Sequence, residues 1–263
     1  MALGIPDELL PVLVPPVFYW IAAGIYHLVL GSTDKYQLFT KEEEESQNLA
    51  TRREVLTGVL LNQAMQIALA ALVFMFTGTG DGKAGAAARP ASLLEVAWQL
   101  AVGMLIMDFW GYFWHRLVHE NKFLFRHVHG MHHKLIVPYA YGGQYIHPVD
   151  AMCGEIASTV FATVITGMSH RTSLLFIILL AFKGMDDHCS MWFPNYHPLH
   201  RWMTNNTAYH AVHHQHQGFK YNYSQHLLAT WDLLLGTNLP YSVEKREGGG
   251  YQISTRNKDT KAA

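Results

Sequence analysis

The 263-residue sequence contains little charge and little cysteine. Charged residues make up 15% of the chain and the formal net charge is -1, whereas a nucleic-acid-binding protein would carry a basic patch. The two cysteines, Cys153 and Cys189, are too few for a disulfide framework, so we expect the polar parts to face a reducing compartment. These scarcities exclude a nucleic-acid binder and a disulfide-stabilised secreted domain.

Several motifs of enzymes are also missing. The glycine-rich loop at 77–92 lacks the GxxxxGK[ST] spacing of a phosphate loop. His119 and Glu120 are not followed by the second histidine of HExxH, which argues against an intramembrane metalloprotease. No dinucleotide fingerprint and no haem-attachment motif occurs, so an oxidative enzyme of this sequence would need electrons from a partner protein.

Charge is nearly absent from three long segments, 9–31, 55–76 and 93–114. Each is long enough to cross a bilayer, which takes about 20 apolar residues. No basic region precedes the first segment and no cleavage site follows it, which favours a retained helix over a signal peptide. Residues 149–185 hold two shorter apolar stretches, which form either two tight crossings or a re-entrant hairpin.

Histidine, by contrast, is abundant, with 17 copies. An HxxxH motif begins at His115, and HxxHH motifs begin at His129 and His210. Residues three or four apart share one helix face, and neutral imidazole is a common ligand of iron, zinc and copper. With His188, nine histidines exceed the six positions of one octahedral ion. We therefore predict two metal ions held among His115, His119, His129, His132, His133, His188, His210, His213 and His214.

Other polar residues accompany these motifs. Asp108 precedes His115 by seven residues, so it either orients a ligand histidine or partners another buried polar group. His147 precedes a proline and is a ligand, a supporting residue or a turn residue. Asp187 and Asn222 are further candidates for supporting or additional ligands. We expect three more histidines to be surface or loop residues: His197, His200 and His226.

Lysine and arginine counts predict the topology. The segment 32–54 carries four of these residues and 77–92 only two, so the positive-inside rule places 32–54 in the cytosol. Alternation then puts every histidine motif on that side. The predicted fold is all-α: one domain over 1–263, a multi-pass membrane helical bundle of four or five transmembrane segments with a cytosolic helical cap holding a dimetal site. The cap comprises 115–148 and 186–240, and a tail at 241–263 is expected to fray.

An all-nitrogen site at a membrane surface suits iron that activates dioxygen, with apolar helices beneath it to hold a lipid chain. A non-catalytic metal-binding or transport protein is the alternative of another class. A transporter, however, would place its ligands near the bilayer midplane.

Five stretches carry a resemblance to a known family: VPYAYG (137–142), DDHC (186–189), NNTAYHAVHHQ (205–215), KYNYSQ (220–225) and WDLLLGT (231–237). Over residues 31–247 the chain resembles the fatty acid hydroxylase/sterol desaturase superfamily of membrane di-iron oxygenases. Within it, the chain is most similar to the sphingoid base hydroxylases of plants and fungi. The resemblance implies that the nine histidines named above are the metal ligands.

The resemblance also implies a sphinganine C-4 monooxygenase, which hydroxylates carbon 4 of sphinganine or dihydroceramide to give phytosphingosine or phytoceramide in sphingolipid biosynthesis. A sterol or fatty acyl hydroxylase or desaturase of the same superfamily is the alternative. The implied cofactors are two iron ions and dioxygen, and zinc can replace iron in purified samples because it binds nitrogen sites more tightly.

The same resemblance implies an endoplasmic reticulum membrane enzyme whose active site faces the cytosol. Electrons would come from NADPH or NADH through cytochrome b5 and its reductase, and other sphingolipid enzymes are candidate partners. We expect the electron donor to dock near Lys122, Arg126, Lys134, Arg201 and Lys220. The sequence assigns no substrate-binding residue.

Overall fold

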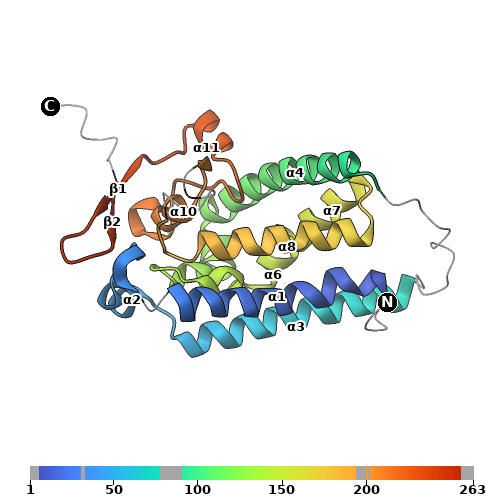
Figure 1. The fold of residues 1–263 in the computed structure, drawn as a ribbon, viewed down its shortest axis with the longest axis horizontal. Helices are drawn as coiled ribbons and strands as arrows, with labels where there is room; N and C mark the ends of the chain where they lie inside the picture. Colours follow the sequence, from blue (N-terminus) through green and yellow to red (C-terminus); the bar gives the residue numbers. More distant parts are fainter. Residues whose placement is uncertain (1–5, 31–32, 78–90, 194–199, 201, 256–263) are drawn as a thin grey trace.

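The computed structural model describes residues 6–30, 33–77, 91–193, 200 and 202–255. These residues form a mostly helical molecule in which long helices lie along one axis and short elements gather at one end (Figure 1). Four described segments are long and apolar enough to cross a membrane, by length and composition: Asp7–Leu28, Arg52–Leu72, Leu93–Glu120 and Pro148–Thr166. The helical membrane-protein class predicted from the sequence is confirmed.

The long helices of the described bundle pack side by side. α1 packs against α3 and α8, while α4 packs against α7 and α8. Apolar side chains such as Leu105 and Val164 are exposed on the outer faces, as expected for helices that contact lipid. In chain order these helices are α1 (Leu10–Ile25), α3 (Arg52–Thr77), α4 (Leu93–Glu120), α7 (Ala157–Thr166) and α8 (His170–Asp187).

Helix α4 extends beyond the span expected at 93–114. It begins at a capping box formed by Ser92 and Glu95, and it ends before Asn121, whose side chain caps α5 (Lys122–His127). No helix-breaking residue stands between Trp114 and Asn121, so the helix continues. The HxxxH motif therefore lies on the last turns of a long membrane-type helix rather than on a separate cap.

The segment expected to form a hairpin, 149–185, consists of two helical legs. The first runs through α6 (Pro148–Asp150) and the π-helical η6 (Ala151–Ile156) into α7. Gly167, with φ +64°, ends this leg, because the left-handed conformation is open to glycine without strain. Helix α8 then returns along the bundle to the histidine-bearing end (Figure 1).

Shorter elements cover that end of the bundle. They rest on α1 and α3, because Tyr19, Val55 and Val59 share a buried cluster with Leu135 and Tyr145. These elements are η2 (Tyr26–Leu30), η3 (Asp34–Tyr36), α2 (Lys41–Gln47), η4 (His129–Lys134), η5 (Ala140–Gln144), α10 (Thr207–His214), η7 (His216–Gly218) and α11 (Thr230–Leu235), besides α5 and α6.

The start of the expected tail is ordered, contrary to the prediction. β1 (Tyr241–Lys245) and β2 (Tyr251–Thr255) pair as an antiparallel hairpin, the one sheet among the described residues. Val243 and Ile253 pack against Leu38 and α10, so the alternating apolar residues of these strands have a buried face. The hairpin lies beside α10 (Figure 1), and the end of the predicted tail, 256–263, lies outside the described residues.

Candidate metal centre

Four elements bring the nine predicted histidines together. α4 carries the HxxxH motif, η4 and α10 carry the HxxHH motifs, and His188 is the C-cap of α8. Local sequence supports these positions. Asn206 caps α10 through its side chain, and a Cβ on Gly130 would lie 2.7 Å from the Phe125 carbonyl oxygen, so glycine permits η4 to fold against α5. Eight of the nine histidines are buried, and His119 is half-buried.

The nine side chains form two groups, within each of which the candidate ligand atoms lie within 4.8 Å of one another. The five-histidine group contains His115, His119, His129, His133 and His213. The four-histidine group contains His132, His188, His210 and His214. Two groups of imidazoles match the expectation of two metal ions.

The groups do not follow the sequence motifs. Residues four apart share a group, as do His115 with His119 and His210 with His214. The middle histidine of each HxxHH motif points to the other group: His132 joins the four-histidine group and His213 the five-histidine group. Each HxxHH motif therefore contributes to both groups, so the two groups are adjacent.

One nitrogen of most rings is fixed by an oxygen acceptor. The Nδ1 atoms of six histidines lie 2.6–3.3 Å from such an oxygen. An oxygen acceptor places the proton on Nδ1 and leaves the Nε2 lone pair free. The acceptors are the carboxylate of Asp150 and the carbonyls of Leu135, Tyr145, Gly184, Tyr221 and Tyr223.

The free nitrogens point at one another. Seven Nε2–Nε2 pairs lie 3.0–3.2 Å apart, and every pair belongs to a single group. Lone pairs of neutral imidazoles at this distance repel, so the arrangement needs an electrophile between them. A metal cation satisfies this need, and imidazole nitrogen is a suitable donor for iron or zinc. The donor set fits two metal ions.

Burial keeps six of the grouped histidines, all outside the candidate membrane spans, in the neutral form. It lowers the pKa of His188 to about 4 and of His213 to about 3. The pKa values of His132, His133, His210 and His214 are also lowered by burial, with further lowering from neighbouring histidines. Neutral rings at physiological pH are the form that binds metal.

The other sequence candidates lie outside both groups. His147 caps α6, with its Nδ1 accepting the Val149 N–H at 3.2 Å, so of the three alternatives it is a turn residue. Asp108 is buried near the backbone of Leu227 and Leu228. Asp187 forms a buried ion pair with Lys183. Asn222 is buried and bonds backbone groups of Tyr209 and Leu239.

Of the histidines expected to be surface or loop residues, His200 is buried and His226 lies in a turn. His200 is 2% exposed and hydrogen-bonds Asp186, which also accepts a hydrogen bond from the Tyr26 hydroxyl. His226 occupies a turn, as predicted, but lines the main cavity. His197 and Arg201 lie outside the described residues.

Sequence reasoning missed Asp150. Its Oδ2 lies 2.6 Å from Nδ1 of His129, and its Oδ1 accepts the Trp114 indole N–H at 2.7 Å. A carboxylate on the outer nitrogen of a ligand histidine fixes the ring and makes the other nitrogen a stronger donor. The signal available in the sequence was its place just after a proline at the start of an apolar helix, which is a common place for an aspartate.

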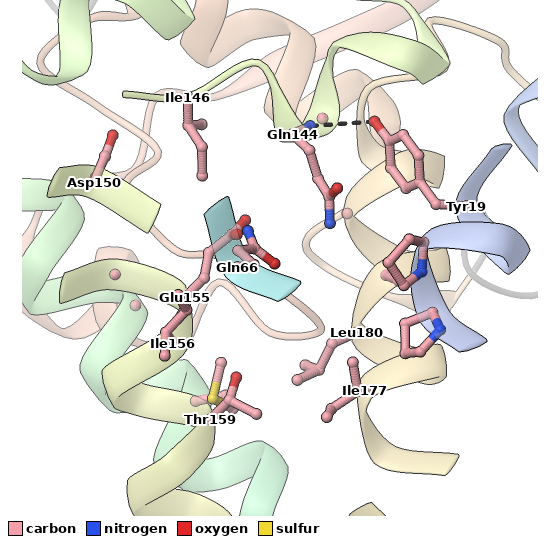
Figure 2. Close-up of a pocket in the computed structure, with 18 of the residues that line it drawn as sticks. Tyr19, Gln66, Gln144, Ile146, Asp150, Glu155, Ile156, Thr159, Ile177 and Leu180 are labelled. Carbon is pink, nitrogen blue, oxygen red and sulfur yellow. Dashed lines mark hydrogen bonds between the residues drawn. The ribbon is translucent and has the colours of Figure 1, made fainter. Parts of the chain in front are cut away.

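A cavity of about 810 Å³ extends from the two groups into the bundle. His115 and His129 of the five-histidine group line one end, with His132, His188 and His210 of the four-histidine group. Apolar residues line much of the remainder, among them Ile146, Ile156, Ile177 and Leu180 (Figure 2). The volume lies in the range of sites for small molecules and lipids.

The sequence of residues 100–237 matches the family model described as fatty acid hydroxylase. The chain belongs to the fatty acid hydroxylase family. The matched residues include all nine histidines and Asp150. The family expected from the five sequence stretches is thereby confirmed.

Characterised relatives of this fatty acid hydroxylase family member cover most of its length. Sphinganine C4-monooxygenase 1 of Arabidopsis thaliana is 44% identical over 96% of this chain and 95% of its own. Sphingolipid C4-hydroxylase sur2 of Schizosaccharomyces pombe is 32% identical over 88% of each chain. The very-long-chain aldehyde decarbonylase GL1-9 of Oryza sativa is 42% identical over 94% of this chain and 95% of its own. No solved structure gives a significant match.

Proposed function

We propose that this protein is a sphinganine C4-monooxygenase, which replaces a C–H bond at carbon 4 of a long-chain base with C–OH. In the overall reaction one oxygen atom of O2 enters the substrate and the other leaves as water, and two electrons and two protons are consumed. The observation that carries the proposal is the pair of inward-facing imidazole groups at the end of a largely apolar cavity. The sphingolipid hydroxylases among its relatives supply the substrate class.

The nine grouped histidines are proposed as the ligands of two iron ions. Iron held by imidazole supplies the oxygen activation that an unactivated C–H bond requires. The chain contributes positioning. Carbonyl acceptors and Asp150 fix the rings, and the apolar walls exclude water and hold the hydrocarbon chain of the substrate.

The proposed location is the endoplasmic reticulum membrane, with the histidine-bearing end in the cytosol. The positive-inside rule and the position of both histidine groups at one end of the bundle support this orientation. Electrons would come from NAD(P)H through cytochrome b5 and its reductase. Four exposed cations near the histidine groups offer a docking surface: Lys122, Arg126, Lys134 and Lys220.

The test is lipid mass spectrometry of a host that lacks its own C4-hydroxylase and expresses the full chain. We expect phytosphingosine with the wild-type chain and markedly less with His132→Ala or His213→Ala, which remove one imidazole from the four-histidine and the five-histidine group respectively. Undiminished phytosphingosine in either variant would refute the proposed site. Formation of an alkane from an aldehyde, or of hydroxylated sterols or fatty acids instead, would assign the chain to another branch. Product that forms without oxygen would exclude a monooxygenase.

A further inference from the structure

The cavity contains one acidic side chain near the histidines that no protein group neutralises. Four carboxylates line the described cavity wall: Glu8, Asp150, Glu155 and Asp187. Asp150 is bonded to His129 and Trp114, and Asp187 is paired with Lys183. Glu8 belongs to the short helix η1 (Asp7–Leu9), which precedes α1, and the N-terminal end of α1 lies at the opposite end of the bundle from α10 (Figure 1). Glu155 is the remaining acid.

Glu155 lies close to the metal centre. It belongs to η6, five residues and about one helical turn after Asp150, the residue that holds His129. Figure 2 shows its side chain pointing from η6 into the cavity. Within the described chain its carboxylate has no hydrogen bond or ion pair, only an electrostatic interaction with Asp150, which is also acidic. An unpaired carboxylate in a membrane-type helix is costly and marks a functional site.

Two amides face the same space. Gln66 of α3 lines the cavity, and its Nε2 is buried without a hydrogen-bond partner among the described residues. Gln144 accepts a hydrogen bond from Gln63 through Oε1, and its side chain extends into the cavity (Figure 2). A carboxylate and two amides in a largely apolar cavity match a ligand head that carries one positive charge and neighbouring hydroxyl groups.

The proposed substrate has such a head. An unacylated long-chain base carries an ammonium group on carbon 2, two bonds from carbon 4, and hydroxyl groups on carbons 1 and 3. A recognition group for the ammonium must therefore lie close to the metals that act on carbon 4. N-acylation removes the charge and adds a second hydrocarbon chain.

We infer that Glu155 receives the ammonium group of an unacylated long-chain base, with the Gln66 amide bonding a neighbouring hydroxyl, and that the free base is the preferred substrate. This inference rests on the proposed function. It also fixes the orientation of the bound lipid. The head lies at the histidine end, and the hydrocarbon tail extends toward Glu8. Glu8 and Tyr19 both line the cavity, and the helical rise between them along α1 is about 16 Å at 1.5 Å per residue.

The experiment compares two substrates with the full chain in membranes of a host lacking its own C4-hydroxylase. Glu155→Gln keeps the shape of the side chain and removes its charge. We expect the KM for sphinganine to rise at least about tenfold, the loss from one charge-assisted hydrogen bond, with kcat within about twofold of wild type. The KM for N-acetylsphinganine, already higher in the wild type, should stay the same in the variant.

The matched control is Glu45→Gln, the same chemical change on the exposed face of α2, which should alter neither constant. Equal losses on both substrates, a fall in kcat alone, or an unchanged KM for sphinganine would overturn the role of Glu155. Absence of 4-hydroxylated product from the wild type would instead refute the proposed function.

A second measurement needs no variant. Octadecylamine and octadecanol have the same chain and differ in charge. The amine should inhibit the wild-type enzyme with an inhibition constant at least about tenfold lower than that of the alcohol. Equal inhibition by the two compounds would overturn the inference.

Discussion

The two histidine groups differ in the number of imidazoles and in the groups that orient them. The five-histidine group includes His129, which is oriented by the charged Asp150. In the four-histidine group, the rings of His132, His188 and His214 are oriented by backbone carbonyls alone. The five-histidine group therefore has more nitrogen donors, and a carboxylate strengthens one of them. The four-histidine group has fewer donors, and neutral backbone carbonyls orient three of them.

The groups also differ in access to the cavity. Three histidines of the four-histidine group line it, against two of the five-histidine group. Four imidazoles leave more of an octahedral coordination sphere open than five. We therefore expect the four-histidine group to hold the ion that meets oxygen and substrate, and the five-histidine group to hold the more tightly bound ion.

The largest effect should come from removing one ligand of the smaller group. His210→Ala leaves three imidazoles there, and we expect activity to fall by more than about a hundredfold, beyond the 10- to 100-fold typical of supporting residues. Metal content should fall from about two ions per chain to about one, because ligand number sets affinity. Product analysis and elemental analysis of the purified chain measure both quantities.

The matched variant is His133→Ala in the five-histidine group. It does not line the cavity, and its Nδ1 has no hydrogen-bond partner in the described structure. Four imidazoles remain, so we expect a smaller loss of activity, about tenfold, and retention of both ions. Equal losses of activity in the two variants would show that the groups are equivalent and would contradict their assignment to different roles.

A smaller effect is expected from the carboxylate that distinguishes the groups. Asp150→Asn keeps a hydrogen-bond acceptor for His129 and removes the charge, so metal affinity should fall by about 10- to 100-fold. Metal retention during titration with a chelator measures the change, and one ion should be lost earlier than in the wild type. Trp114→Phe, which removes the bond to Oδ1 and leaves the charge of Asp150, is the control and should retain metal better. If both variants release metal alike, the charge of Asp150 does not strengthen the five-histidine group.

The sequence predicted the histidine groups better than their surroundings. Imidazoles at intervals of three and four residues form a local pattern, which marks eight of the nine, whereas His188 stands alone in the sequence. The division of the nine was not identifiable, because the position of His132 in one group and His133 in the other depends on which element packs opposite each ring. The same holds for Asp150, whose role depends on the contacts of α6 with α4 and η4, and for Glu155, whose role depends on the cavity that η6 and α3 both line.

The errors in the prediction share a physical cause. His200 belongs to a polar stretch, yet Asp186 provides a buried partner for it from α8. The strands at 241–255 occur in a charged segment and pack their apolar face on α10 and Leu38. In both cases a tertiary contact overrides the exposure or fraying that the local sequence favours. No pattern within the segment reveals that contact.

The smallest effect should come from a histidine that belongs to neither group. His147 accepts the Val149 N–H as the cap of α6, so His147→Ala should cost about 1 kcal/mol and lower the melting midpoint in detergent by about 2–4 °C. His147→Asn, which supplies another good capping side chain, should restore the midpoint. Metal content and activity should match the wild type in both variants. Loss of an ion in His147→Ala and His147→Asn would make His147 a ligand and would end the division into groups of five and four.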